Sequence, residues 1–443
     1  MKIILCTTCK GRAQHVERTL PRNLSDNADY ADFTILLLDY NSDDHLLEYV
    51  RAHHARDLAS GRLVDYSYRE PGPFRMSHAK NLAHRLAIEE GADVLVNMDA
   101  DNWAAPGFAT WIAEQFRGGC EFLWTNAKSV CGRARQGLAG RIVLSKHLFL
   151  AIGGYDERFI HWAPEDEDLK VRVRRLIGVE GQRIEDRFLY VIPHRDGLRF
   201  KEYPHAKPTP ESEAASLKLI REASTTIANF GDCGRGVVFR NFDIDPITIG
   251  PMPTRVFGIG THKTGTTSLH HAFQLLGYDS AHWTGPGWAK RIWNEMKEAG
   301  RSVTLERHLA LCDEPFGLLF RELDRAYPGS KFILTTRDED RWLQSVRNHW
   351  SPINPWRKTW DEDFFTHRMH QLMYGQRSFE PETMLARYRA HNRAVRAHFK
   401  DRPDDLLEMN MERGFNWGPL CAFLNKPVPA VDYPRAFVTK GAR

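Results

Sequence analysis

Short apolar runs that end in polar residues alternate with helix-period segments through the first 200 residues. MKIILCTT, DFTILLLDY and ADVLVNMDAD are such runs, and HAKNLAHRLAIEEG lies between two of them. Strand–helix–strand alternation predicts a mainly parallel sheet with helices on both faces. Ligands of such sheets bind at the carboxyl ends of the strands, where the polar residues of these runs fall. The sequence therefore predicts an α/β fold with a binding site at that edge of its sheet.

A second α/β pattern begins at Arg255, after a stretch of different character. YPHAKPTPESEA is rich in proline and polar residues, and FDIDPITIGPMP is typical of a linker. Beyond it, RVFGIG predicts a strand, THKTGTTSLHHAFQLLG a loop that opens into a helix, and SKFILTTRD another strand. A chain of 443 residues suits two or three domains. We therefore predict an N-terminal domain over 1–235, a linker over 236–253 and a C-terminal domain over 254–443.

The bulk composition disfavours several classes of protein. Lys and Arg (61) barely exceed Asp and Glu (57), and a net charge of +4 does not favour nucleic acid as the main partner. No stretch approaches the roughly 18–20 apolar residues that span a bilayer, and the apolar start is too short for a signal peptide. Cys6 and Cys9 have no second pair at zinc-site spacing, and the seven cysteines do not suggest a disulfide framework. We predict a strand and loop position for this pair and a reduced, cytoplasmic setting.

The segment GIGTHKTGTTSL follows one predicted strand and opens a helix. Backbone N–H groups and the dipole at such a helix start form an anion site. Gly260 and Gly265 allow close approach of the backbone to a phosphate, and Lys263 supplies a positive charge. Thr266, Thr267 and Ser268 add hydroxyl donors at the same helix start. A nucleoside-triphosphate P-loop reads G-x-x-x-x-G-K-[ST], whereas here the lysine precedes the second glycine by two residues, which excludes that motif.

The order K-T-G-T-T-S after a strand resembles the loop of PAPS-dependent sulfotransferases that holds the 5′-phosphosulfate end of the donor. In SKFILTTRDEDRWLQS, Arg337 ends a strand and Ser345 follows eight residues later, the spacing with which that family holds the 3′-phosphate. The resemblance covers about residues 255–435 and implies a P-loop-like α/β domain. The donor PAPS would be bound by these two residues together with the loop residues Gly260, Thr264, Gly265, Thr266, Thr267 and Ser268. A P-loop kinase fused to a nucleotidyltransferase is disfavoured by the lysine position and by the Arg337–Ser345 pair.

Sulfuryl transfer needs a charge that stabilises the leaving oxygen and a base that takes the acceptor proton. Lys263 is the natural stabiliser of that oxygen, and the resemblance concerns the base. It places the base between the two donor motifs, in ERHLALCDEPF, where His308, Asp313 and Glu314 are the candidates. The Asp-x-Pro element resembles bacterial members of the family and favours Asp313.

Carboxylates gather in the N-terminal half. LVNMDADN ends a strand with Asp99-x-Asp101, and two carboxylates at this spacing can face a divalent cation that bridges a diphosphate. Asp39 ends another strand, where a carboxylate can bind the base or ribose of a nucleotide. Farther along lie a Gly-Gly turn, the acidic cluster of W-A-P-E-D-E-D-L, and His194, an imidazole that can complete a metal site.

Together these motifs resemble GT-A glycosyltransferases of the family-2-like kind. The GGYDE…EDED-L…PHRD run looks like the C-terminal part of the β-1,4-galactosyltransferases and related N-acetylgalactosaminyltransferases. The resemblance implies that Asp99, Asp101 and His194 bind Mn²⁺ or Mg²⁺ and that Asp166 is the base of an inverting transfer. It also implies a donor contact from Asp99 and contacts with the donor diphosphate from Thr8, Arg12 and Lys80. W-A-P stands where the galactosyltransferases have a glycine-rich turn, so the identity of the donor sugar stays open.

The two halves together predict a bifunctional transferase. One domain would transfer a sugar from a UDP-sugar to a glycan or glycolipid acceptor, and the other would sulfate a carbohydrate hydroxyl, in bacterial surface polysaccharide synthesis. In the alternative, the N-terminal domain is a non-catalytic glycan-binding module. Peripheral membrane contact is compatible with either interpretation, and the sequence does not indicate the oligomeric state. Trp103, Trp162, Trp283 and Trp288 lie near the motifs and can stack on sugar rings, although core packing is the better interpretation for any single one.

Overall fold

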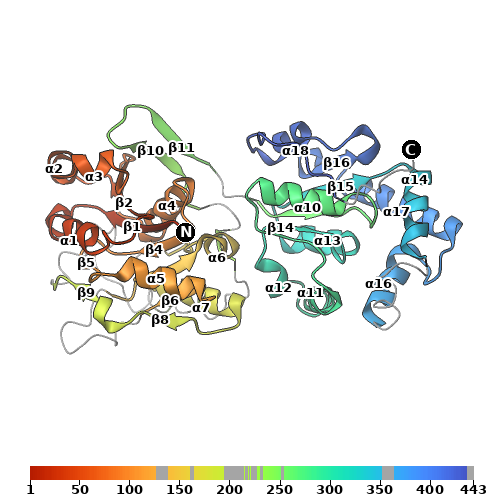
Figure 1. Cartoon of the computed structure of the whole chain (residues 1–443), viewed down its shortest axis with the longest axis horizontal. Coiled ribbons are helices and arrows are strands. Elements are labelled where there is room, and N and C mark those ends of the chain that lie inside the picture. The colour runs from red at the N-terminus through yellow and green to blue at the C-terminus, as the bar shows by residue number, and fades with distance from the viewer. Residues whose placement is uncertain are drawn as a thin grey trace. The chain divides into compact units, whose positions relative to one another are not determined.

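The computed structural model of the chain describes residues 1–125, 138–159, 164–193, 227–229, 233–250, 254–351 and 364–436, with the isolated residues 214, 218 and 220. The chain divides into two compact units, Met1–Met252 and Pro253–Arg443 (Figure 1). Each unit has its own sheet. None of the described helices combines the length and the apolar character needed to cross a bilayer.

The N-terminal unit is built on a nine-stranded sheet in the order β11-β10-β3-β2-β1-β4-β7-β6-β8. Its four central strands, β3, β2, β1 and β4, run parallel, while β7 is antiparallel to both β4 and β6. The chain order therefore reverses between β1 and β4, which is where open α/β sheets bind their ligands. The strands are β1 (Ile3–Cys9), β2 (Phe33–Tyr40), β3 (Leu63–Tyr68), β4 (Val94–Asn97), β6 (Phe122–Trp124), β7 (Ile142–Ser145), β8 (Gln182–Arg183), β10 (Gly236–Arg240) and β11 (Pro246–Ile249), and β5 (Asn102–Trp103) pairs separately with β9 (Tyr190–Val191).

Helices cover both faces of this sheet, as the alternating pattern predicts. One face packs against apolar residues of α4, α6 and α7, and the other against those of α1, α2 and α5. The helices are α1 (Ala13–Asp26), α2 (Leu46–His53), α3 (Ala55–Ala59), α4 (Met76–Glu89), α5 (Phe108–Arg117), α6 (Lys146–Ala151), α7 (Glu165–Ile177) and the short 3₁₀ helix η1 (Asp186–Phe188).

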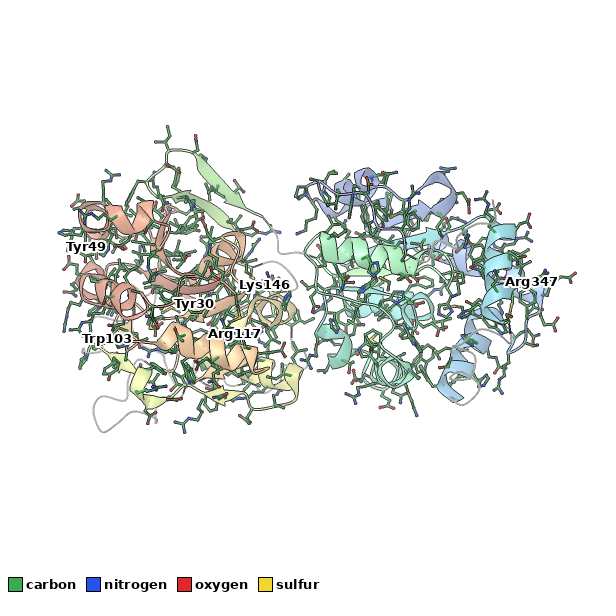
Figure 2. The ribbon with its side chains drawn as sticks, viewed as in Figure 1. Tyr30, Tyr49, Trp103, Arg117, Lys146 and Arg347 are labelled. Atoms are coloured by element: carbon green, nitrogen blue, oxygen red, sulfur yellow. The ribbon has the colours of Figure 1, made fainter. Side chains whose placement is uncertain are left out.

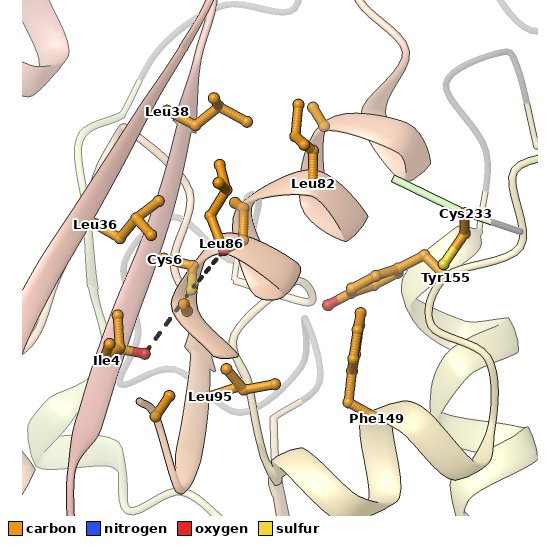
Figure 3. Close-up of a cluster of buried hydrophobic side chains, with 14 of the residues drawn as sticks. Ile4, Cys6, Leu36, Leu38, Leu82, Leu86, Leu95, Phe149, Tyr155 and Cys233 are labelled. Atoms are coloured by element: carbon orange, nitrogen blue, oxygen red, sulfur yellow. Dashed lines mark hydrogen bonds between the residues drawn. The ribbon is translucent and has the colours of Figure 1, made fainter. Parts of the chain in front are cut away.

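Strand β1 is buried along its whole length, because a central parallel strand is covered on both faces. Its side chains alternate, so Cys6 joins the cluster under α4 and Cys9 joins the opposite one. Figure 3 shows Cys6 beside Ile4 in the first cluster, facing Leu86 of α4. The two thiols thus lie on opposite faces of the sheet as free, buried cysteines, and burial raises the pKa of each. They are strand residues with no redox pairing.

The segment expected to be a linker takes a different form. Residues 236–249 form a hairpin, in which β10 pairs antiparallel with β3 and β11 forms the outer edge of the sheet. Arg240 of β10 also donates to Glu90 at 2.7 Å. Pro246, part of the proline content that suggested a linker, begins the edge strand β11, where a missing backbone N–H breaks no hydrogen bond inside the sheet. The N-terminal unit accordingly extends to Met252.

The C-terminal unit has a five-stranded, wholly parallel sheet in the order β13-β14-β12-β15-β16. Its strands are β12 (Val256–Gly258), β13 (Ser280–Ala281), β14 (Ala310–Cys312), β15 (Lys331–Thr336) and β16 (Leu406–Asn410). Its helices are α10 (Thr266–Leu275), α11 (Pro286–Ala299), α12 (Val303–Glu306), α13 (Phe316–Ala326), α14 (Glu339–His349), α16 (Phe364–Tyr374), α17 (Pro381–His398) and α18 (Trp417–Leu424), with the 3₁₀ turns η3 (Pro403–Asp405) and η4 (Met411–Arg413). Because β12 lies between β14 and β15, the residues that follow these three strands meet at one edge. The α/β class predicted for both halves is confirmed.

Candidate active sites

Parallel pairing brings the predicted nucleotide-site residues of the N-terminal unit to one edge of the sheet. Cys9, which follows Thr8, is in register with Asp39 of β2, and Cys6 is in register with Asn97 at the end of β4. Asp99 and Asp101 follow β4 directly, and Arg12 precedes the first residue of α1. Residues from distant parts of the sequence therefore meet beside the point where the strand order reverses.

Asp99 and Asp166 converge on a glycine that the sequence analysis did not single out. A Cβ atom on Gly140 would lie 3.0 Å from Oδ2 of Asp166 and 3.1 Å from Oδ2 of Asp99. The Gly140 carbonyl is fixed by Asn97, whose Nδ2 donates to it at 2.6 Å. The structure thus joins the predicted metal ligand and the predicted base in one site. It does so through a backbone approach that only glycine allows without displacement of the carboxylates.

Lys80, which the sequence resemblance places at a donor diphosphate, lies against carboxylates. Its Nζ is 2.9 Å from Oε1 of Glu165 and 2.6 Å from Oδ1 of Asp166, with the side chain only 1% exposed. Burial opposes its charge, but Asp166 and Glu165 outweigh that effect and hold the pKa of Lys80 well above its usual value. Burial raises the pKa of Glu165 to about 7. A buried ammonium needs such partners, so Lys80 positions the acidic start of α7.

Arg141 is a second buried cation that the motifs did not indicate. Its guanidinium donates to Oδ1 of Asn102 at 3.0 Å and to the carbonyls of Trp103, Phe188 and Tyr190. Burial lowers its pKa to about 10, against the opposing charges of Asp99 and Asp101. Arg141 therefore fixes the loop after Asp101 against β9 and places a positive charge beside the two carboxylates.

Asp65 of β3 is fully buried, and neither of its carboxylate oxygens has a hydrogen-bond partner within the described part of the chain. Burial, with a smaller contribution from the Asp39 carboxylate, raises its pKa to about 8. Burial likewise raises the pKa of Asp39, whose Oδ1 accepts a hydrogen bond from the Ser42 amide at 3.0 Å. A buried acceptor without a donor is a site that a ligand can satisfy.

Asp99 and Asp101 supply the hard oxygen donors that Mn²⁺ and Mg²⁺ prefer, so the donor set at this edge fits such a cation. The remaining predicted ligand, His194, lies outside the described residues, as does Trp162. Trp103 of β5, labelled in Figure 2, stacks on Tyr190 with ring centroids 5.3 Å apart, and the guanidinium carbon of Arg22 lies over the Trp103 ring at 4.8 Å from its centroid. These contacts occupy the ring of Trp103 within the protein.

The predicted phosphate loop of the C-terminal unit connects β12 to α10, and both of its glycines are sterically required. A Cβ on Gly260 would lie 2.0 Å from Oγ1 of Thr335. Gly265 has φ +97°, and a Cβ there would lie 2.5 Å from the ring of Phe415. Lys263 also has a positive φ of 65°, a strained value for a residue with a side chain. The loop is therefore held in one tight form with Lys263 at its bend.

The loop hydroxyls divide into two groups. Thr264 is fully buried, and its Oγ1 lies 2.6 Å from the Thr261 carbonyl and 2.7 Å from Oγ1 of Thr335, so this side chain shapes the loop. Ser268 accepts a hydrogen bond from the amide of Ala436. The hydroxyls of Thr266 and Thr267 lie 3.3 and 3.5 Å from Nε2 of His282. Thr266 and Thr267 thus share a second polar group, His282, which the sequence analysis missed.

Arg337, the first residue after β15, lies directly beside the loop. Its Nη1 donates to the Lys263 carbonyl at 3.4 Å, and its own backbone amide and carbonyl are both held by the Tyr388 hydroxyl at 2.9 Å. It also lines a cleft of about 330 Å³. Three further arginines line this cleft, Arg389, Arg393 and Arg396 of α17, together with Glu339, Glu408 and other polar residues. Ser345 is half-buried two turns into α14 and is not one of the lining residues.

Asp313 lies between two imidazoles just after β14. Its Oδ1 is 3.1 Å from Nε2 of His262, and its Oδ2 is 3.3 Å from Nε2 of His282. Burial opposes its ionisation, but His262, His282 and Lys263 outweigh that effect and hold the pKa of Asp313 well below its usual range. Glu314 lies 3.3 Å from His262, and burial raises its pKa to about 7. The neighbourhood of Lys263 therefore contains an ionised carboxylate with two imidazoles.

The structure separates His308 from this group. His308 precedes β14 and pairs with Asp279 at 3.1 Å, and its carbonyl accepts a hydrogen bond from Arg255, which precedes β12. Because β12 and β14 run parallel, His308 lies at their amino ends, while Lys263 and Asp313 follow their carboxyl ends. The prediction of His308 as a candidate base is therefore wrong, because the residue lies away from Lys263 and Asp313. Trp283 and Trp288 pack partly buried against the cluster of Ala289, Phe365 and Met369.

Comparisons with known proteins agree with this division. Residues 255–441 match the family profile described as "Sulfotransferase domain", so the C-terminal unit carries a sulfotransferase domain and the protein is a transferase. A protein of Aspergillus versicolor described as "Ava biosynthesis cluster protein M" is 26% identical over 219 residues, covering 42% of this chain and 82% of that protein.

Solved structures of GT-A glycosyltransferases are also similar to the chain. They include the mannosyltransferase PcManGT from Pyrobaculum calidifontis in complex with GDP-Man and Mn²⁺, with 13% identity, a TM-score of 0.35 and coverage of 50% of this chain and 70% of that one. S. aureus TarS 1-349 in complex with UDP-GlcNAc has 13% identity, a TM-score of 0.40 and coverage of 90% and 92%. Glucosyl-3-phosphoglycerate synthase from Mycobacterium tuberculosis in complex with Mn²⁺, UDP and glucosyl-3-phosphoglycerate has 16% identity, a TM-score of 0.34 and coverage of 57% and 90%.

Proposed function

We propose that the protein is a bifunctional transferase whose C-terminal unit moves a sulfuryl group from PAPS to a carbohydrate hydroxyl. The observation that carries this proposal is the contact of Arg337 with the carbonyl of Lys263 within the sulfotransferase domain. It supports one donor site that holds both the phosphosulfate end, at the loop, and the 3′-phosphate, at the arginine-lined cleft. The arginines of α17 suit a phosphate group, because one guanidinium group can donate two parallel hydrogen bonds to two oxygens of a phosphate.

The charges around Lys263 account for the chemistry of transfer. The acceptor oxygen attacks sulfur as the bond from sulfur to the bridging phosphate oxygen breaks, and Lys263 stabilises the negative charge that develops on that oxygen. The acceptor proton passes to the ionised carboxylate of Asp313, and the neighbouring imidazole of His282 shares the charge. Glu314 is the less accessible acceptor at the same place, because its side chain is 2% exposed and that of Asp313 is 13% exposed. The products are the sulfated acceptor and PAP.

The N-terminal unit carries the second activity of the proposal, inverting transfer of a sugar from a UDP-sugar to a glycan or glycolipid. It is supported by the convergence of Asp99 and Asp166 on Gly140. Asp99 and Asp101 would hold Mn²⁺ or Mg²⁺, which when bound neutralises the donor diphosphate. Asp166 would take the proton of the acceptor hydroxyl, and Lys80 fixes its carboxylate for that role. Asp39 and Asp65 offer acceptors to the N–H and O–H groups of the nucleoside.

A single assay tests both halves. Purified full-length protein is incubated with a panel of UDP-sugars, Mn²⁺ and simple glycosides, with and without PAPS, and the product masses are measured. We expect a gain of one sugar mass, followed by one sulfate mass when PAPS is present. Asp166→Asn is expected to abolish the first gain and retain sulfation of a presupplied glycan. Sulfate gain on glycosides with no sugar transfer by the wild type would favour the alternative, in which the N-terminal unit only binds the glycan.

A further inference from the structure

Three histidines from separate elements of the C-terminal unit meet at one point. His262 lies in the loop after β12, His349 is the last residue of α14, and His370 lies in α16. One side-chain nitrogen of each lies within 4.8 Å of those of the other two. The ring centroids are 6.0, 5.9 and 6.2 Å apart, so the imidazoles surround a common centre. Sulfuryl transfer as proposed above uses neither His349 nor His370.

The hydrogen bonds of His262 leave one ring nitrogen available for a ligand. Its Nε2 faces the carboxylates of Asp313 and Glu314 at 3.1 and 3.3 Å, and its Nδ1 is buried without a hydrogen-bond partner among the described residues. A carboxylate on the second nitrogen is the usual support of a metal-binding histidine, because it orients the ring and raises its basicity. The Asp313 carboxylate also offsets the positive charge of nearby Lys263.

The surroundings of the cluster are largely aromatic. The ring of Trp350 lies 4.9 Å from that of His370, and the ring of Tyr374 lies 5.9 Å from those of both His262 and His370. His370 is buried and His262 and His349 are mostly buried. An apolar shell that limits access of water favours retention of a bound ion and leaves the imidazole nitrogens as its ligands.

From this arrangement we propose that His262, His349 and His370 form a binding site for a divalent transition metal, with zinc as the representative ion. Three imidazoles select zinc, cobalt, nickel or copper over magnesium and calcium, which prefer oxygen ligands. Zinc–nitrogen bonds of about 2.0–2.1 Å require nitrogens closer together than they are here, so binding draws the three rings inward. A site with three protein ligands keeps a coordination position open to water or to a substrate oxygen. The site ties α14 to α16, two helices that residues 350–363 separate in the sequence.

Cobalt titration tests the proposal without any measurement of activity. Chelator-treated full-length protein is titrated with Co²⁺ while its visible absorption is recorded, because nitrogen-ligated Co²⁺ of low coordination number absorbs strongly. We expect the absorption of the wild type to saturate at one equivalent of Co²⁺ per chain. His349→Ala and His370→Ala should each weaken Co²⁺ binding on the order of 100-fold, and Asp313→Asn by about 10–100-fold. His271→Ala is the matched control, since His271 is exposed on α10 and its loss should change nothing.

The N-terminal carboxylates must be distinguished from this site. Asp99→Asn combined with Asp101→Asn should leave the Co²⁺ signal intact, because oxygen-ligated octahedral Co²⁺ absorbs weakly. X-ray absorption of the wild type with one Co²⁺ should show three imidazole ligands, a result that does not depend on the folding of a buried variant such as His370→Ala. The proposal is overturned if no stoichiometric Co²⁺ signal develops, or if His349→Ala binds as tightly as the wild type. Either result would leave the proposed sulfate transfer untouched.

Discussion

Replacement of Asp65 by asparagine should make the protein more stable at neutral pH, although it removes an ionisable residue from the middle of a strand. The Asp65 carboxyl is buried beside Asp39, and both of its oxygens lack partners in the described structure. Its pKa rises to about 8, from a usual value near 3.9 in an unfolded chain. The folded state thus binds this proton more tightly than the unfolded state does. Stability is therefore lost as pH rises from about 4 to about 8.

The size of the effect follows from that difference. Each pKa unit corresponds to about 1.4 kcal/mol, so the need to keep Asp65 protonated in the folded state lowers the free energy of unfolding by up to about 4 kcal/mol at pH 7 and by about 1 kcal/mol at pH 4.5. Asparagine has a similar shape and does not ionise, so the variant avoids this loss. If Asp65 is an acceptor for the proposed nucleotide, the same variant should bind UDP more weakly despite its greater stability.

Scanning calorimetry of the full-length protein at pH 4.5 and pH 7.5 measures this difference. The transition of the N-terminal unit should shift upward in Asp65→Asn by several degrees more at pH 7.5 than at pH 4.5. Asp43→Asn serves as the control, because Asp43 is exposed in the loop after β2 and should give the same small change at both pH values. Parallel pH profiles for wild type and Asp65→Asn, or a destabilised variant at pH 7.5, would refute the reasoning.

Two further predictions concern the reacting groups. Gly140→Ala should lower the kcat of sugar transfer by at least about 10-fold, because its Cβ displaces the carboxylates of Asp99 and Asp166. The control Gly250→Ala, whose Cβ meets nothing within 4 Å, should retain full activity, and equal rates for the two variants would contradict the role of Gly140. Asp313→Asn should lower the kcat of sulfation by about 10²–10⁴-fold, because it removes the proposed base. His308→Asn should leave this kcat unchanged, because His308 lies at the amino ends of β12 and β14. A large loss of kcat in His308→Asn alone would show that Asp313 is not the base.

The features of the fold and the sites that could be predicted from sequence are those encoded locally. Apolar runs with polar ends located β1, β2 and β4, and the topology of a parallel sheet then brought Asp39 and Asp99 to one edge. The need for Gly260 and Gly265 followed from the tight turn before α10. Local patterns of this kind reflect backbone sterics and burial, which act over a few residues.

The remainder depends on contacts between distant residues. Nothing in the sequence around Gly140 or Arg141 shows that they meet Asp99, Asp166 and β9, because those contacts exist only once the sheet has formed. The assignment of Lys80 to a phosphate failed to anticipate its burial between two carboxylates of α7. His308 could have been set aside from the sequence, since a residue two positions before a strand lies at its amino end. The histidines of the proposed metal site come from three elements and share no motif.

The most direct test of the central claim is sulfate transfer by the full-length protein and by Lys263→Met. PAP release and the mass of a sulfated glycoside are followed with PAPS as the donor, and calorimetry checks that both proteins are folded. We predict PAPS-dependent sulfation by the wild type and a kcat about 10²–10³-fold lower in the variant, because Lys263 stabilises the leaving oxygen. Folded wild type that releases no PAP with any acceptor, or a Lys263→Met protein with an unchanged kcat, would contradict the account.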